Sequence, residues 1–266
     1  MKYRIFSAVV ALLCTGLGFS TASQAGGYGN YSDVSISVIG DNGRHYPMYP
    51  AGGHHQTQRS WLEARRGRNY GISIRNNTNE RVGVVIAVDG RNIISGKSSN
   101  LSQRERMYIL EPYKSTVYRG WRSSRNQVNR FYFTDYRDSY AYAWNDTARM
   151  GVIAAAVYRE RAPYYQQPPQ KERRRGPSWG DQSHRNRPGT GYGYEERSPS
   201  IRVEFQPEVR ASSRHFIRYE WHEGLCRRGV IDCGQHRYRD RQPPRRRPYY
   251  DDGYAPPPPS KYYRGR

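Results

Sequence analysis

Hydrophobic residues alternate with polar ones in several short stretches of the first 160 residues. Val34, Ile36 and Val38 have polar neighbours, and the stretches 70–74 and 81–88 repeat this pattern. Neighbouring residues of an extended chain point to opposite sides, so a period of two places the apolar side chains on one face of a strand. We therefore predict half-buried β-strands in this part of the chain.

A turn signal follows the strongest of these stretches. Asp89-Gly90 comes directly after 81–88, and we expect the partner strand at 91–95. Asp-Gly favours the two-residue turns that connect the strands of a hairpin. Further strands are expected at 106–110, 115–121, 128–134 and 151–158.

Short strands separated by Gly, Asn and Asp predict an all-β fold. No stretch has the 3.6-residue period of an amphipathic helix, although 139–144 fits one short helical turn. We expect an antiparallel β-sandwich, Ig-like or jelly-roll-like, over residues 30–160. A segment of that length is large enough for one hydrophobic core.

The composition changes after residue 160. Fourteen of the 17 prolines lie there, together with only nine Ile, Leu, Val and Phe residues. Segments with so little apolar surface cannot offset the entropy that folding removes. We predict a disordered basic linker at 161–198, in which Gly189–Gly193 is a flexible connector, and a disordered basic tail at 235–266.

The nine apolar residues of the second half all lie within 199–234, which we predict to be a small ordered add-on. Alternation predicts a strand at 201–205, and a second strand is expected at 216–221. The piece is too small to fold alone, so we expect it to dock on the sandwich or to pair with its edge.

The N-terminal 25 residues have the three parts of a secretory signal peptide. Lys2 and Arg4 supply the positive region, and residues 5–19 form an apolar stretch too short to span a membrane comfortably. Ser23-Gln24-Ala25 fits a cleavage site. We expect an exported protein of the periplasm or cell surface of a bacterium.

Export changes the interpretation of the cysteines. Cys14 leaves with the signal peptide, so Cys226 and Cys233 remain. An even number of cysteines in an oxidising compartment favours a disulfide between them. The alternative is two free thiols.

Several motifs resemble those of a group of uncharacterised exported bacterial proteins. The matching motifs are RVGVVIAVDGRNIISG at 81–96, Gly-Trp at 120–121, Phe-Tyr-Phe at 131–133, Gly-Val-Ile at 151–153, and weaker matches at 189–193 and 203–205. The resemblance implies a bacterial envelope protein with one β domain. The group has no settled activity, so it implies no catalytic residue.

The charge of the chain points to anionic partners. The net charge is +21, and 39 of the 44 basic residues are arginines, whose planar guanidinium suits phosphate, carboxylate and aromatic faces. The expected polyanion-binding residues combine arginine runs with tyrosines of the two basic segments: Arg173, Arg174, Arg175, Arg245, Arg246, Arg247, Tyr249 and Tyr250. A tail that only improves solubility is the alternative interpretation.

Catalytic and metal-binding patterns are weak. No histidine or cysteine lies between residues 56 and 183, so that stretch cannot supply a Ser-His-Asp system or a zinc site by itself. His54-His55, with His45 nearby, is interpreted as a solvated loop. Three aspartates fit ordinary turns better than a calcium site or a glycosidase pair: Asp135, Asp138 and Asp146.

The sequence therefore predicts a non-catalytic envelope protein without metal or cofactor. Its Arg/Tyr-rich segments would hold an anionic polymer: lipid phosphate, acidic polysaccharide or extracellular DNA. Association with the membrane would be peripheral, and the sandwich would offer a surface for a protein partner. The alternatives are an envelope assembly subunit that donates the strand 201–205 to a neighbouring chain, and a glycan-acting enzyme that uses carboxylates.

Overall fold

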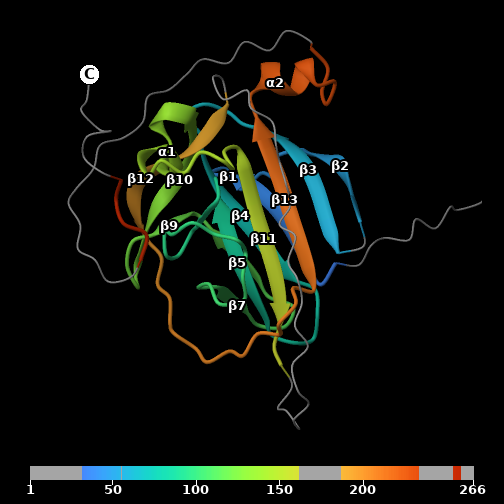
Figure 1. Ribbon diagram of the computed structural model, residues 1–266, viewed down its shortest axis with the longest axis vertical. Coiled ribbons are helices and arrows are strands. Elements are labelled where there is room, and N and C mark those ends of the chain that lie inside the picture. The colour runs from blue at the N-terminus through green and yellow to red at the C-terminus, as the bar shows by residue number, and fades with distance from the viewer. Residues whose placement is uncertain (1–31, 55, 162–186, 234–253, 259–266) are drawn as a thin grey trace, which may run out of the picture. The chain divides into compact units, whose positions relative to one another are not determined.

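The structure is a computed structural model that describes residues 32–54, 56–161, 187–233 and 254–258 (Figure 1). The predicted signal peptide, the arginine runs at 173–175 and 245–247, and Tyr249 and Tyr250 lie outside these residues. Strands in two sheets are the main regular structure of the described part, and helix is scarce, so the expected all-β class is confirmed.

The first sheet has six strands, and β4 and β10 are its two central members. Its main order is β1-β4-β10-β12, while β8 also pairs with β4 and β9 with β10. The bounds are β1 Val34–Gly40, β4 Asn69–Asn76, β8 Ser115–Tyr118, β9 Gly120–Arg122, β10 Gln127–Asp135 and β12 Pro188–Arg197.

The second sheet has seven strands in the order β2-β3-β13-β11-β5-β6, and β7 also pairs with β5. The bounds are β2 Met48–His54, β3 Thr57–Glu63, β5 Val82–Val88, β6 Arg91–Asn92, β7 Tyr108–Leu110, β11 Val152–Arg159 and β13 Ser213–Glu220. Figure 1 shows β13, β11 and β5 side by side. The pair β13–β3 is parallel, so this sheet is mixed rather than antiparallel throughout as predicted.

The hydrophobic core forms where the two sheets face each other. The alternating residues Val82, Val84, Ile86 and Val88 of β5 are fully or almost fully buried there, as their period of two predicted. Aromatic rings connect the sheets: the rings of Phe133 in β10 and Tyr219 in β13 lie 5.3 Å apart between centroids. The fold is therefore sandwich-like.

Asp89 and Gly90 form the predicted hairpin turn between β5 and β6. Their φ angles are 50° and 82°, which are the positive values that a type I′ turn requires. Gly tolerates such values without strain, and Asp is one of the few other residues that adopts them readily.

The predicted linker at 161–198 extends too far. Residues 188–197 form β12, which pairs with β10 over most of its length. Thr190 and Tyr192 are buried, and the glycine between them leaves room for the neighbouring strand: a Cβ on Gly191 would lie 2.1 Å from Cζ of Tyr132. The glycines that suggested a flexible connector are close-packing positions in a strand.

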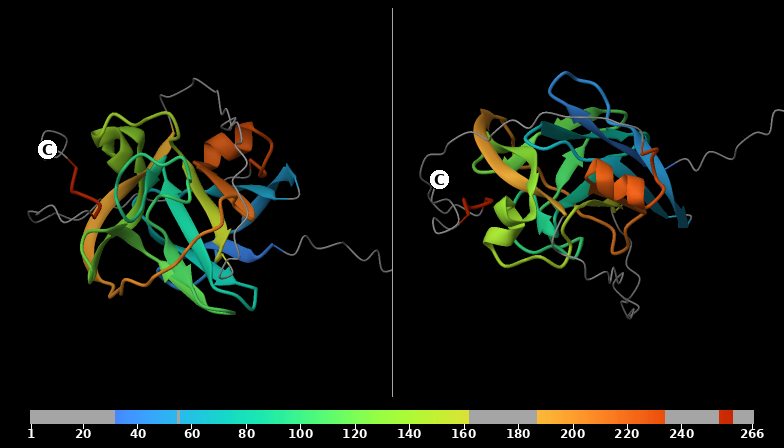
Figure 2. Two further views of the ribbon diagram at one scale, coloured as in Figure 1. Left: turned by 60° about the horizontal axis from the view of Figure 1, so that its bottom comes forward. Right: turned by 90° about the horizontal axis from the view of Figure 1, so that it is seen from above.

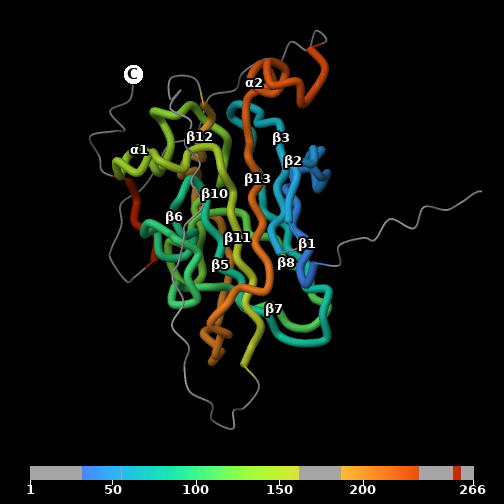
Figure 3. The backbone as a smooth tube through the Cα atoms, turned by 45° about the vertical axis from the view of Figure 1, so that its right-hand side comes forward, coloured from blue at the N-terminus to red at the C-terminus, as the bar shows by residue number. Residues whose placement is uncertain are grey.

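The segment 199–234 differs from the predicted add-on in two ways. Residues 201–205 form no strand, and the Ile201 side chain is 85% exposed. By contrast, β13 lies between β3 and β11 in the second sheet instead of at its edge. Figure 3 follows the chain, in orange, along the lower end of the molecule into β13. A strand from this segment is thus part of the sandwich.

Helix in the described ranges is confined to short elements. These are the 3₁₀ turn Tyr136–Asp138, α1 Tyr140–Ala143 and α2 His222–Arg227. The predicted disulfide is present: Cys226 in α2 bonds to Cys233, with 5.1 Å between their Cα atoms. Figure 2 shows α2 and the turn that follows it on the periphery of the strands.

Part of the predicted disordered tail is also placed. Residues 254–258 lie against the sandwich, and Ala255 is fully buried. Among the helices of the described residues, none has the length and apolar character needed to cross a membrane.

Candidate functional site

A pocket lies on the face of the second sheet that points away from the main core. Ala87, Ala154 and Phe216 come from the adjacent strands β5, β11 and β13, and they are direct neighbours in the strand register. Two small side chains beside a large one leave a hollow in the sheet surface. The cavity volume is about 90 Å³, the size of a small chemical group rather than a large ligand.

Two loops form the walls of this pocket. One contains Ser99, Asn100 and Leu101, and the other contains Ala148, Arg149 and Met150. The Arg149 side chain donates a hydrogen bond to the Ser99 carbonyl, and this bond connects the two walls. Leu101 belongs to a second apolar cluster, whose other buried members are Val85, Ala87, Ala156, Tyr158, Ala211 and Phe216.

Four arginines surround the apolar floor: Arg149, Arg187, Arg214 and Arg218. Arg149 and Arg214 are exposed, whereas Arg187 is buried. The described lining contains no aspartate or glutamate. We name this feature the arginine-rimmed pocket. An apolar floor below guanidinium groups fits an anionic group that carries a short apolar portion.

Glu220 reduces the charge on one side of the rim. Burial raises the pKa of its carboxyl, while the Trp221 N–H and the charges of Arg228, Arg187 and Arg218 act in the opposite direction. Arg187 and Arg218 therefore have a nearby carboxylate that balances part of their charge. Arg149 and Arg214 are left as the main source of positive charge for a ligand.

The arginine and tyrosine residues predicted to bind polyanions lie outside the described residues, so the structure neither places them together nor separates them. The arginine-rimmed pocket was missed by the sequence analysis. Its lining comes from five separate parts of the chain, and no contiguous motif marks it. The available signal was the small residue Ala at the outward positions 87 and 154 of strands that are otherwise rich in Val and Ile.

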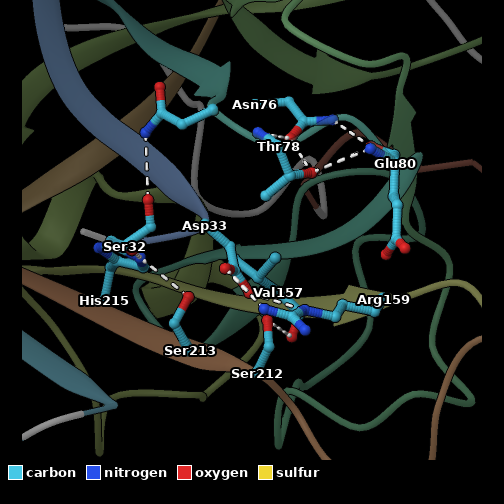
Figure 4. A network of polar contacts seen from close by, with 11 residues as sticks. Ser32, Asp33, Asn76, Thr78, Glu80, Val157, Arg159, Ser212, Ser213 and His215 are labelled. Carbon is cyan, nitrogen blue, oxygen red and sulfur yellow. Dashed lines mark hydrogen bonds and ion pairs between the residues drawn. The ribbon is translucent and has the colours of Figure 1, made fainter.

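The structure also brings a histidine into the core from outside the stretch 56–183. His215 lies in β13, and its Nε2 is 3.3 Å from the hydroxyl oxygens of both Ser32 and Ser213 (Figure 4). Burial lowers the pKa of His215 to about 4.

This serine–histidine group lacks the third member of a catalytic triad. The nearby carboxylate of Asp33 accepts two hydrogen bonds from Arg159, at 3.0 and 2.9 Å, and the bond from Arg159 is the largest effect lowering the pKa of Asp33 (Figure 4). The Asp33 carboxylate is thus held by Arg159, whereas the carboxylate of a triad orients the imidazole ring. The arrangement fits a structural polar contact.

A second buried polar group joins the two sheets. The Asp89 carboxylate accepts hydrogen bonds from the Tyr219 hydroxyl (2.5 Å), from the Gly151 N–H (2.8 Å) and from the Thr190 N–H (2.7 Å). The Thr190 hydroxyl in turn lies 2.6 Å from that of Tyr70. Burial raises the pKa of Asp89 to about 6. The group is enclosed, so we assign it to folding rather than to ligand binding.

Two of the three aspartate candidates are held in ion pairs. Asp135 forms an ion pair with Arg66 and Asp146 with Arg91, while Asp138 lies near Asp135 and has a raised pKa, mainly because of burial. His45 contacts the Ser37 hydroxyl at 3.0 Å. His54 is exposed as expected, but it is the last residue of strand β2 rather than part of a loop, and His55 is outside the described residues. The described residues contain no group of three or more metal-ligating side chains.

Comparisons with known protein families, with curated proteins and with solved structures found no match to this chain. The resemblance to exported bacterial proteins therefore stays a prediction. The interpretation of the site relies on its geometry alone.

Proposed function

We propose that this protein is a non-catalytic binding protein that holds a phosphate-bearing lipid headgroup in the arginine-rimmed pocket. The supporting observation is the position of exposed Arg149 and Arg214 beside an apolar floor of Ala87, Ala154 and Phe216. Guanidinium groups form strong hydrogen bonds with phosphate oxygens, and their charge persists at any physiological pH.

The apolar floor favours a lipid over the other anionic polymers. Acidic polysaccharide and DNA present charged and hydroxyl-rich surfaces, which gain little from contact with Ala and Phe side chains. A glycerophospholipid presents its phosphate next to apolar carbon. The small volume of the pocket admits one such group at a time.

The location of the protein and the role of its basic segments are proposed from the sequence. An exported, peripherally associated protein would encounter anionic lipid in a bacterial envelope. An Ig-like or jelly-roll-like sandwich would present the pocket, and the segments that contain Arg173–Arg175 and Arg245–Tyr250 would add weak, salt-sensitive contacts. Several weak contacts on one chain raise the overall affinity without a second pocket.

A vesicle co-sedimentation titration tests this function. The full chain would be mixed with vesicles of phosphatidylcholine, with and without phosphatidylglycerol, across a salt series. The test variant is Arg149→Gln with Arg214→Gln. The matched control is Arg75→Gln with Arg197→Gln, which removes two exposed arginines from strands β4 and β12 of the other sheet.

We expect the pocket variant to bind phosphatidylglycerol vesicles about 30-fold more weakly, because each basic residue near an anionic surface contributes about 1 kcal/mol. The control should lose much less. Equal losses in the two variants would show that binding follows net charge, and the proposal would be rejected. If soluble acidic polysaccharide or DNA displaced the protein by binding at the same arginines, the lipid assignment would be rejected.

A further inference from the structure

The segment Tyr254–Pro258 packs against the sandwich in a groove, which we define by the residues that contact it: Gly96, Arg106, Arg122, Tyr140 and Tyr192. Figures 1 and 2 show it in red beside β12 and β9. Its sequence is Tyr-Ala-Pro-Pro-Pro, and it forms neither strand nor helix. Prolines fix φ near −65° and favour an extended polyproline II conformation, which leaves backbone carbonyls available to partners.

Hydrogen bonds hold the backbone of this segment at three points. The Ala255 N–H donates to the Arg122 carbonyl at 2.7 Å. The Tyr140 hydroxyl donates to the Pro256 carbonyl at 2.7 Å, and the Tyr192 hydroxyl donates to the Ala255 carbonyl at 3.3 Å. Two tyrosines from α1 and β12, whose rings stack at 5.3 Å, thus present their hydroxyls to successive carbonyls of a proline-rich segment.

Side chains of the segment also pack closely against the groove. Ala255 is fully buried and belongs to the main core cluster, and the guanidinium of Arg106 lies 5.2 Å from the ring centre of Tyr254. Gly96 forms part of the groove: a Cβ there would lie 2.8 Å from Cδ of Pro256 and 2.9 Å from Cα of Ala255. The groove therefore has space for a peptide backbone only because residue 96 has no side chain.

Aromatic walls and hydroxyl donors to peptide carbonyls are the features with which proline-rich peptides are recognised. We propose that this groove is a binding site for a Tyr-Ala-Pro-Pro-Pro segment, that the chain's own Tyr254–Pro258 occupies it, and that the same segment of a second copy replaces it. The site is separate from the arginine-rimmed pocket.

The length of the connection supports exchange between copies. Twenty residues, 234–253, separate Cys233 from Tyr254. A chain of twenty residues spans at most about 70 Å, so connectivity permits the segment to reach either its own groove or that of a neighbour. The chain's own segment competes for the groove at an effective concentration on the order of millimolar. This competition lowers the apparent affinity of the groove for the segment of a second copy, but it does not prevent exchange.

The probe for this proposal is a labelled synthetic peptide, DGYAPPPPS, which corresponds to residues 252–260. Its binding to the full chain would be measured by fluorescence anisotropy. In the variant Ala255→Asp, a charge replaces the buried methyl group and displaces the chain's own segment. We expect this variant to bind the peptide at least tenfold more tightly than the unmodified chain. The charge-matched control Val209→Asp changes a side chain that is 59% exposed and should bind like the unmodified chain.

Two further measurements identify the groove. Adding Tyr140→Phe and Tyr192→Phe to Ala255→Asp removes both hydroxyl donors at nearly constant volume, and peptide binding should weaken at least fivefold. In the unmodified chain, the Ala255 amide is the only N–H within 255–258, and an excess of peptide should accelerate its hydrogen exchange. Unchanged exchange at millimolar peptide, or equal affinity of the Ala255→Asp variant and the unmodified chain, would overturn the proposal.

Discussion

Two buried titratable residues contribute in opposite directions to the way the stability of the fold responds to pH. Asp89 has its pKa raised to about 6 by burial, so the native state retains a proton that the unfolded chain loses between about pH 4 and pH 6. Its contribution to stability is complete below pH 4 and declines as pH rises through 6. His215 acts in the opposite direction: its pKa is lowered to about 4, so its contribution is complete above pH 6.5 and declines as pH falls toward 4.

Because the two pH ranges overlap, the effects offset each other in the unmodified chain, and single substitutions should separate them. Asp89→Asn preserves a turn-forming pair with Gly90 but cannot titrate. Relative to the unmodified chain, we expect the free energy of unfolding of this variant to rise from pH 4 to pH 6.5. The change is at most about 3 kcal/mol, as expected for a pKa shift of about two units.

His215→Gln should give the opposite difference, a free energy of unfolding that falls relative to the unmodified chain over the same range. Urea denaturation at several pH values measures both. Differences between variant and unmodified chain cancel the contributions of other groups, such as Asp33. If both variants changed the pH dependence in the same direction, the assignment of these titrations would be wrong.

At the scale of elements, local pattern predicted some strands well and others poorly. The hairpin of β5 and β6 was predictable because alternation and the Asp-Gly turn lie within sixteen adjacent residues, 81–96. The strand β12 was not, since every second residue over 189–193 is a buried glycine and its pairing partner β10 lies more than fifty residues earlier. The alternation of Thr190 and Tyr192 with glycine was present in the sequence but resembled a linker.

The pair Gly120-Trp121 illustrates how a glycine determines an element. Gly120 of β9 lies opposite Arg130 of β10, and a Cβ on Gly120 would be 2.2 Å from the Asn129 carbonyl oxygen. Trp121 is fully buried, and its Nε1–H donates to the Gly191 carbonyl at 3.1 Å. The close approach of the two strands places the indole inside the core.

Gly120→Ala should therefore lower the free energy of unfolding by about 2–3 kcal/mol, since backbone rather than a movable side chain must shift. Chemical denaturation monitored by tryptophan fluorescence measures this loss. The matched control is Gly40→Ala in β1, whose nearest neighbour would be the Asn42 side chain at 3.1 Å. The control should change stability by less than about 1 kcal/mol, and an equal loss in both variants would contradict the steric argument.

At the scale of the whole molecule, distant segments are combined to form both candidate sites. The arginine-rimmed pocket takes its floor from β5, β11 and β13, which the chain reaches between residues 82 and 220. The bias toward arginine and aromatic residues, interpreted from sequence as a sign of polyanion binding, also contributes to the fold: Arg66 lies 4.3 Å from the ring centre of Trp221 and Arg91 lies 5.3 Å from that of Trp144. Composition alone could not distinguish these two uses.

The position of β13 also determines which part of the chain can fold. Sequence composition suggested that residues 30–160 contain a complete sandwich. The structure places β13 between β3 and β11, and β12 beside β10. A chain that ended at residue 162 would leave the backbone hydrogen-bonding groups of β3, β11 and β10 without these partners, and would expose core residues that Ile217, Tyr219 and Tyr192 cover.

We therefore expect a chain ending at residue 162 to unfold without a cooperative transition, whereas a chain ending at residue 234 retains one. Circular dichroism during heating, with both chains prepared identically, measures the difference. A sharp transition in the shorter chain would show that the first 160 residues form a sandwich without β12 and β13. The expected result also has a practical consequence: tests of membrane or peptide binding need point variants of the full chain, because removing the second half would remove strands of the sandwich together with the basic segments.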